Sequence, residues 1–219
     1  MTRITIVNAG MSEDSATARL GRAVETALRD SRGADAGELR ITWVNLRTLA
    51  RPIADHLVTG FPNRVLAEAL GQVSEADALV VLTPVYQGSY SGLFKSFFDL
   101  VEEGAVEGKP VLLGATGGTP RHSLVTEHAL RPLFTYMRAL VIPTAVFVAT
   151  EDWGAHASDS RGDAGAKLHQ RLQRAATQLL GFTGVGSSAS VASAQALAAG
   201  GRDAEVPDFE ALLHGLARR

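Results

Sequence analysis

The sequence predicts an α/β fold, in which one parallel sheet is covered by helices on both faces. Five apolar runs of strand type alternate along the chain with stretches in which apolar residues recur every three or four positions. The first, third and fourth runs are apolar almost throughout, as a strand buried on both faces requires. Strict alternation implies right-handed crossovers, and five strands favour the doubly wound order 2-1-3-4-5.

The expected strands are residues 4–7, 39–46, 78–82, 110–114 and 140–149. The second run differs from the others, because Ile41 and Trp43 alternate with the polar residues Thr42 and Asn45. Alternation indicates a strand with only one fully apolar face, so this run is expected at or near the edge of the sheet.

The expected helices carry apolar stripes within residues 20–28, 65–73, 93–101, 124–133 and 168–179. Pro132 lies inside the fourth stripe. Because proline lacks a backbone N–H and crowds the preceding turn, that helix is expected to kink or restart there.

Length and composition indicate one folded domain, which we assign to residues 1–182. Residues 183–204 are rich in Gly, Ala and Ser, which is typical of a flexible linker. The chain then ends with a segment in which Phe209, Leu212 and Leu216 could form one apolar face. We therefore interpret residues 183–219 as a flexible linker and a short C-terminal segment that docks on its own domain or on a neighbour.

Charge and composition exclude several functional classes. The formal net charge of −2 provides no excess of positive charge for nucleic acid or for an anionic membrane surface. The absence of cysteine excludes disulfides and thiolate metal sites and fits a reducing cytoplasm. No signal peptide is evident, no run reaches the ~20 apolar residues of a membrane span, and no histidines have metal-ligand spacing. We expect a cytoplasmic protein without a metal site.

Ligands bind at the carboxyl ends of the strands in an open parallel sheet, and three such ends carry unusual residues. After the first strand comes NAGMSEDSAT, residues 8–17, in which Ser12, Ser15 and Thr17 supply hydroxyl groups. The backbone amides of residues 15–17 lie where a helix is expected to begin, an arrangement that binds phosphate without lysine. Alternatively, Ser12 or Ser15 is only the N-cap of that helix.

The third strand is followed by PVYQGSYSG, residues 84–92. This loop offers backbone amides near Gly88 and Gly92 and the flat rings of Tyr86 and Tyr90, with no evident acid, base or metal ligand. That combination favours a flat, uncharged aromatic ring over a substrate for hydrolysis. The alternative is an ordinary loop that uses Gly and Pro to join a strand to a helix.

The fourth strand is followed by ATGGTPRH, residues 115–122. Gly117 and Gly118 let the main chain approach a ligand closely, or they serve a turn that needs only their flexibility. Arg121 and His122 are either binding residues or solvated surface residues. Together, a phosphate pocket and two loops around a flat ring describe a site for a mononucleotide with a planar base.

These motifs resemble those of the NAD(P)H-dependent FMN reductases, a flavodoxin-like family, over roughly residues 1–182. The family's phosphate loop has the form GSxRxxSxT. In this chain Ser15 and Thr17 match it, Ala9 and Gly10 replace its Gly-Ser, and Ser12 replaces its arginine.

The family's flavin-ring loop has the form PxYxGxxxGxxK. It is matched without a gap by Pro84, Tyr86, Gly88, Gly92 and Lys95. The third loop of the family corresponds to residues 116–118. Within the family, the run GGTPRHSLVTEHALRPLF resembles the branch that supplies reduced flavin to luciferase-like monooxygenases.

The resemblance implies a five-stranded flavodoxin-like sheet, FMN as cofactor, NADPH or NADH as reductant, and a homodimer or homotetramer. It implies an NAD(P)H:FMN oxidoreductase that transfers hydride from nicotinamide to FMN, needs no catalytic side chain, and supplies reduced flavin to a flavin-dependent monooxygenase. The expected cofactor-binding residues are Gly10, Ser12, Ser15, Ala16 and Thr17 at the phosphate, Pro84, Val85, Tyr86, Gln87 and Gly88 at the ring, and Thr116, Gly117 and Gly118 at its pyrimidine end.

Two other interpretations stay open at this point. A quinone or azo reductase of the same fold would keep its FMN and reduce an organic acceptor. A flavodoxin-type electron carrier, or a binding module without a cofactor, would not be an enzyme. A carrier depends on a strongly acidic docking face, for which a net charge of −2 offers little.

Overall fold

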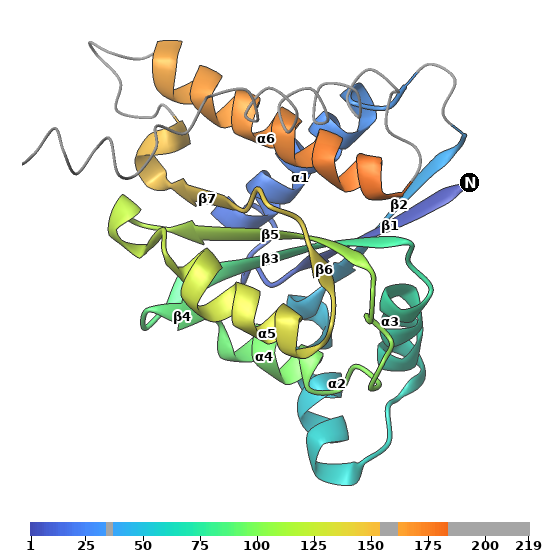
Figure 1. Ribbon diagram of the computed structural model, residues 1–219. Helices are drawn as coiled ribbons and strands as arrows, with labels where there is room; N and C mark the ends of the chain where they lie inside the picture. Colours follow the sequence, from blue (N-terminus) through green and yellow to red (C-terminus); the bar gives the residue numbers. More distant parts are fainter. Residues whose placement is uncertain (34–36, 154–161, 184–219) are drawn as a thin grey trace, which may run out of the picture. The chain divides into compact units, whose positions relative to one another are not determined.

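A parallel sheet with the strand order β2-β1-β3-β5-β6 forms the centre of the fold, and β7 also pairs with β5 (Figure 1). The computed structural model describes residues 1–33, 37–153 and 162–183. Within these ranges the strands are β1 (Thr2–Asn8), β2 (Leu39–Asn45), β3 (Ala78–Tyr86), β4 (Ser89–Tyr90), β5 (Pro110–Gly117), β6 (Leu140–Val141) and β7 (Val146–Ala149). Only the short β4 runs antiparallel to its neighbour, β3.

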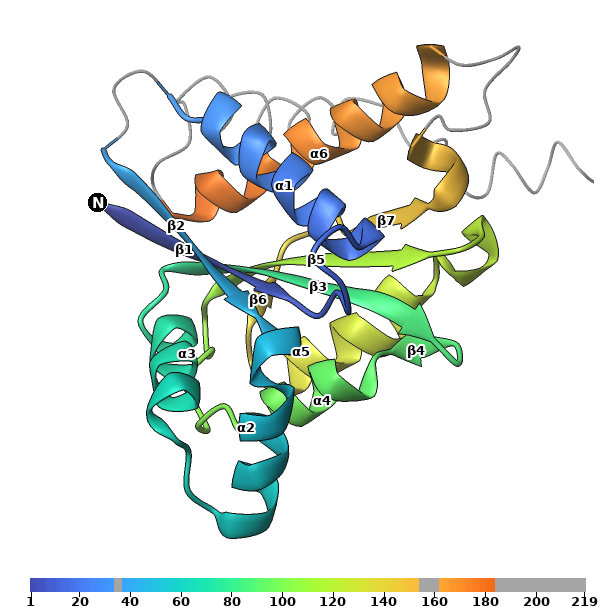
Figure 2. The same cartoon turned by 180° about the vertical axis from the view of Figure 1, so that it is seen from behind.

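Helices cover both faces of this sheet (Figures 1 and 2). On one face lie α1 (Ala16–Asp30) and α6 (Gly162–Phe182), which contact each other. On the other face lie α2 (Leu46–Thr59), α3 (Arg64–Ser74), α4 (Gly92–Phe98) and α5 (Arg131–Tyr136). The predicted α/β architecture with helices on both faces is therefore confirmed.

The central strands are buried on both faces, as their apolar runs predicted. Along β3, Val80 and Leu82 belong to the core layer beneath α1 and α6. Leu79 and Val81 belong to the opposite layer, which also contains Phe94 of α4. Because successive side chains of a strand point to opposite faces, both sets must be apolar in a sheet that is covered twice.

The strand order agrees with the predicted 2-1-3-4-5 order, with two differences in detail. The fifth expected strand, residues 140–149, is divided into β6 and β7. Pro143 lies in the interruption and cannot donate a backbone hydrogen bond to the sheet. The third strand continues beyond residue 82 and turns back on itself as β4, so the sheet has seven strands.

One helix was not predicted. The buried residues of α2 are Leu46, Leu49 and Ile53, which is a sparse helical stripe. Pro52 lies inside the helix and interrupts the sequence signal. The predicted linker and C-terminal segment, residues 183–219, lie outside the described residues apart from Thr183, so that assignment stays a prediction.

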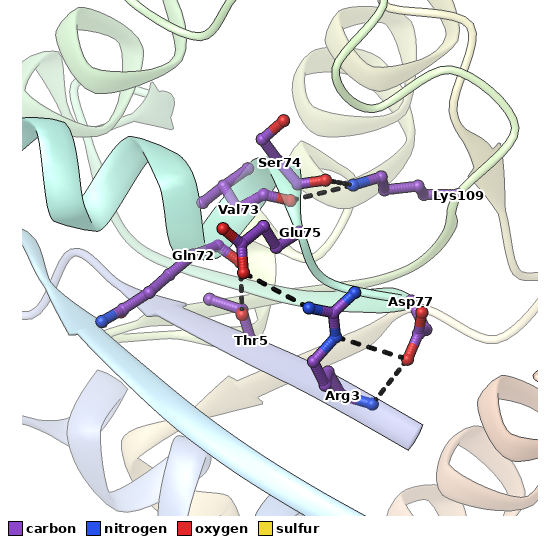
Figure 3. Close-up of polar contacts among 8 residues, drawn as sticks. All are labelled: Arg3, Thr5, Gln72, Val73, Ser74, Glu75, Asp77 and Lys109. Atoms are coloured by element: carbon purple, nitrogen blue, oxygen red, sulfur yellow. Dashed lines mark hydrogen bonds and ion pairs between the residues drawn. The ribbon is translucent and has the colours of Figure 1, made fainter. Parts of the chain in front are cut away.

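Polar contacts tie the amino-terminal edge of the sheet to the end of α3 (Figure 3). The backbone N–H of Arg3 donates to Asp77 at 2.7 Å, and the Thr5 hydroxyl donates to the Gln72 carbonyl at 2.8 Å. The ammonium group of Lys109 donates to the carbonyls of Val73, at 3.1 Å, and of Ser74. A cation at this position satisfies carbonyls that the helix leaves unpaired. Burial lowers the pKa of Lys109 below its ordinary value.

Candidate functional site

The carboxyl edge of the sheet has a step beside β1. Asn8, the last residue of β1, pairs with Leu82 of β3, whereas β3 continues to Tyr86. Four further residues extend a strand by ~13 Å. On the other side of β3, β5 extends to Gly117 and pairs along it as far as Thr116. The beginning of α1 therefore faces two strands that project past the end of β1.

The loop from β1 to α1 is held in a tight turn. The Asn8 side chain accepts a hydrogen bond from the Gly10 N–H at 3.0 Å, and its amide donates to Asn45 at 3.0 Å. A Cβ atom on Gly10 would lie 2.1 Å from the Ser15 hydroxyl, so no other residue fits without movement. The glycine found where the family motif has serine therefore has a steric cause.

The first turn of α1 presents free hydrogen-bond donors. The Ser15 hydroxyl accepts from the Ala18 N–H at 3.1 Å, which makes Ser15 the N-cap that was one of the two predicted alternatives. Its own proton stays available, because a hydroxyl both donates and accepts. The backbone N–H groups of Ala16 and Thr17 have no acceptor among the described residues. A helix start of this kind suits an anionic group such as a phosphate.

The segment PVYQGSYSG forms a β-hairpin, with Val85 paired to Tyr90 and Tyr86 paired to Ser89. Its turn residues Gln87 and Gly88 both have positive φ, at 50° and 76°. Positive φ at both central positions is the geometry of the tight hairpin turns that match strand twist. The connection from β3 to α4 is therefore a tight hairpin and not an open loop.

A buried threonine fixes the base of this hairpin. The Thr83 hydroxyl donates to the Pro84 carbonyl at 2.9 Å and accepts from the Ser91 N–H at 3.0 Å. Ser91 in turn caps α4 through the Phe94 N–H. At the tip, Tyr86 is half exposed. Tyr90 packs against Phe94, with 5.8 Å between the centroids of the two rings.

The third predicted loop meets the first directly. The hydroxyls of Thr17 and Thr116 lie 2.8 Å apart, and both side chains are buried. Gly117 ends β5, and Gly118 is exposed just beyond it. Ser15, Ala16 and Thr17 thus share one corner of the sheet with residues 116–118, and the projecting end of β3 lies alongside β5 there.

Ser12 lies in the loop before α1, and its carbonyl accepts a hydrogen bond from the Ser15 N–H at 3.2 Å. Its side chain is exposed and borders a cavity of about 550 Å³ between α1 and β2, together with Arg22, Arg47 and Trp43. Arg47 pairs with Glu13 at 3.0 Å, and Arg22 with Asp14 at 3.6 Å. These exposed ion pairs connect residues 13 and 14 of the loop to α2 and α1, and each contributes little stability on its own.

A second cavity, of about 360 Å³, opens beside the hairpin turn, and none of its described lining residues belongs to α1. It lies between the hairpin turn, the 3₁₀ turn η1 (Pro120–His122) and the π-helical turn η2 (Thr126–Leu130). The π turn ends just before Pro132, which restarts the helix as predicted. Glu127 on this turn is bound to Arg131 at 3.0 Å, and this hydrogen bond lowers the pKa of its carboxyl group.

Two residues that organise the corner were not predicted. Asn8 and Thr83 are both almost completely buried, and each holds a loop through hydrogen bonds. The available signal was a lone polar residue at the end of an apolar strand, since buried polar groups are almost always hydrogen-bonded. The π turn had no comparable signal apart from Pro132.

None of the helices in residues 1–33, 37–153 and 162–183 combines the length and apolar character that a membrane span requires. The sheet order and the helices on both faces define a flavodoxin-like α/β fold, in which ligands bind at the carboxyl edge of the sheet. The free N–H donors of Ala16 and Thr17 at the start of α1 fit the phosphate of FMN.

Comparison with known proteins agrees with this class. The family model described as NADPH-dependent FMN reductase matches residues 2–154. The NADH-dependent FMN reductase SfnE of Pseudomonas putida is 36% identical, over 83% of this chain and 92% of that protein. An FMN reductase (NADPH) of Pseudomonas aeruginosa is also 36% identical, over 69% of this chain and 78% of that protein.

The solved structures add a neighbour of the same kind. An oxidoreductase from Corynebacterium diphtheriae superposes with a TM-score of 0.77 and 37% identity, covering 84% of this chain and 97% of that one. The chain belongs to the NADPH-dependent FMN reductase family. It is an enzyme of the oxidoreductase class, with FMN and NAD(P)H as its cofactors, and the predicted resemblance is confirmed.

Proposed function

We propose that this enzyme reduces FMN at the corner between α1, the hairpin and the end of β5, and releases the reduced flavin to a flavin-dependent monooxygenase. The observation that carries the location is the convergence of the three segments. The α1 start offers free N–H donors, and the Thr17–Thr116 contact joins it to the end of β5. The hairpin borders the same edge of the sheet.

In this proposal each segment has one binding task. Gly10, Ser15, Ala16 and Thr17 hold the phosphate through hydroxyl and backbone donors, with Ser12 at the outer edge of the loop. Residues 84–88 lie along the isoalloxazine ring. The backbone amides of residues 116–118 face the pyrimidine end, where donors stabilise developing negative charge. FMN supplies the redox chemistry when bound, and the protein supplies position and electrostatics.

The release of reduced flavin is the finer part of the proposal. Its support is the likeness of residues 117–134 to the branch that serves luciferase-like monooxygenases. Relatives named for NADH and for NADPH match at equal identity, so we propose that the chain accepts either reductant. We also propose a cytoplasmic homodimer or homotetramer, as the family resemblance implies.

Titration of FMN into apoprotein, followed by flavin absorbance and fluorescence, tests the phosphate assignment. A Ser15→Ala/Thr17→Ala variant should bind FMN at least tenfold more weakly, because it removes the Ser15 hydroxyl as a donor to a charged group and also the buried Thr17 hydroxyl that joins this loop to Thr116. Thr59→Ala, at the exposed end of α2, is the matched control. Equal FMN affinity of the double variant and the wild type would contradict the assignment.

A second assay separates flavin export from the retained-flavin alternative. NAD(P)H oxidation by the purified enzyme is followed with and without added free FMN. An exporting reductase should speed up with free FMN and should support turnover of a separately added monooxygenase. A rate that ignores free FMN but responds to a quinone or an azo dye would identify an acceptor reductase that keeps its cofactor.

A further inference from the structure

The cavity of about 360 Å³ beside the hairpin has the composition of an anion site. Its described lining includes Arg121, His122 and His128, and none of the lining residues is acidic. These three side chains have no hydrogen-bond or ion-pair partner within the described part of the chain. Glu127, the neighbour of His128 on η2, is bound by Arg131 of α5 and also interacts electrostatically with His128. The donors in the cavity are therefore available to a ligand.

The position of the cavity links it to the flavin corner. Gly88 and Ser89 of the hairpin line one wall, and the same hairpin is proposed to run along the isoalloxazine ring. The opposite wall comes from η1 and η2, which follow Gly117, the last residue of β5, in the sequence. Figure 1 shows the β4 hairpin at the same end of the sheet as the carboxyl end of β5. An anion bound here would lie beside the ring, away from the α1 start.

The reductant needs an anion site in this position. Its nicotinamide must stack on the flavin ring, and one ribose separates the nicotinamide from a pyrophosphate. Arginine offers a planar fork of donors that matches phosphate oxygens, and imidazole adds further donors. The volume is also in the ordinary range for a site that receives part of a small ligand. Leu124, Val125 and Ala129 provide apolar surface for the ribose.

We propose that Arg121, His122 and His128 form the subsite for the pyrophosphate of NAD(P)H. This rests on the proposed function, because it assumes that the flavin ring lies along the hairpin. The enzyme would then have two anion sites with different tasks. The α1 start would hold the monophosphate of FMN, and the cavity would hold the pyrophosphate of the reductant.

The decisive experiment compares two hydride donors in Arg121→Gln. With NAD(P)H, kcat/KM should fall by about tenfold to a hundredfold, as expected when a charged hydrogen bond to phosphate is lost. With 1-benzyl-1,4-dihydronicotinamide, which carries no phosphate, the substitution should cause no comparable loss. His128→Asn should also lower kcat/KM with NAD(P)H and not with the phosphate-free donor, and this loss should be smaller than that in Arg121→Gln. Arg64→Gln, an exposed arginine on α3, is the control for loss of one positive charge.

A measurement without turnover keeps the two proposals apart. Binding of NADP⁺ and NAD⁺ is followed by calorimetry in wild type and in Arg121→Gln, and inorganic pyrophosphate is tested as a competitor. Weaker dinucleotide binding in the variant, with competition by pyrophosphate in the wild type, supports the subsite even if FMN reduction fails. An equal loss with both hydride donors, no loss with NAD(P)H, or dinucleotide binding that ignores Arg121 would overturn it.

Discussion

The hydroxyl groups of Thr17 and Thr116 lie 2.8 Å apart and join the first turn of α1 to the end of β5. The two side chains are only 1% and 4% exposed, so water does not replace either partner. This contact couples the loop proposed to bind phosphate to the loop proposed to face the ring. The corner is thus one connected unit before any ligand enters it.

Replacing either threonine by valine should destabilise the enzyme. Valine keeps the shape but leaves the other hydroxyl buried without a partner, which costs about 1–3 kcal/mol. The Thr17→Val/Thr116→Val double variant should recover much of this loss, because neither hydroxyl remains unsatisfied. Urea unfolding of the three variants measures the coupling. Strictly additive losses would show that the two hydroxyls do not depend on each other.

Gly10→Ala should disrupt the phosphate loop. The new Cβ would lie 2.1 Å from the Ser15 hydroxyl and 3.0 Å from the Asn8 side chain, so the N-cap of α1 must shift. Loss of an N-cap costs about 1 kcal/mol, and the affinity for FMN should fall with it. Thermal unfolding and FMN titration report the two effects separately.

Gly71→Ala is the matched control for this substitution. Gly71 lies within α3, and nothing is within 4 Å of its added Cβ. Since alanine is the better helix former, this variant should be about 0.5–1 kcal/mol more stable than the wild type and should bind FMN normally. If both alanine variants behaved alike, the steric argument at Gly10 would be wrong.

The sequence predicted the parts of the fold that depend on local pattern. The runs of β1, β3 and β5 were clear because double-sided burial demands continuous apolar residues. The three loops were found because topology places them at one edge of the sheet. These arguments need only the identity of each residue and its position along the chain.

The features that the sequence did not predict depend on contacts between residues far apart in the chain or on local signals that compete with one another. The partner of Thr17 lies 99 positions away, and no local pattern reveals it. The hairpin requires positive φ at Gln87, a residue that seldom adopts it, so the run resembled an open loop. In α2, Pro52 concealed a helix that packing against α3 and α4 supports.

The hairpin turn offers a test of its role. Gly88→Ala places a Cβ at φ 76°, which costs about 1–2 kcal/mol in the left-handed region. Because the turn is exposed, most of this cost should appear as loosening of the hairpin. The affinity for FMN should therefore fall, whereas the melting temperature of the enzyme should change little. Gly108→Ala is the matched control, because Gly108 also has positive φ (69°), nothing lies within 4 Å of its added Cβ, and it precedes the amino end of β5; it should carry a similar strain and leave the affinity for FMN unchanged. If Gly88→Ala bound FMN as tightly as the wild type, the hairpin turn would not contribute to the flavin site.

Lys109 stabilises the edge of the sheet opposite the flavin corner. Lys109→Met removes the donors to the Val73 and Ser74 carbonyls and should lower the free energy of unfolding by about 1–2 kcal/mol at neutral pH. Lys109→Arg keeps a cation and several donors, so it should recover part of this loss. FMN binding should be normal in both variants, because the contacts lie at the other end of the strands.

The pH dependence of the Lys109 contribution has a definite sign. Burial lowers the pKa of the folded ammonium group below its ordinary value of 10.5. Between the lowered value and 10.5, the unfolded chain therefore binds more protons than the folded chain, and the contribution of Lys109 to stability rises with pH. Methionine does not titrate and arginine stays protonated, so the wild type should gain stability over both variants by the same increment as pH rises through this window. Urea unfolding across the alkaline range measures the difference in free energy of unfolding between the wild type and each variant. If the wild type lost stability relative to the variants as pH rises, the effect of burial on Lys109 would be contradicted.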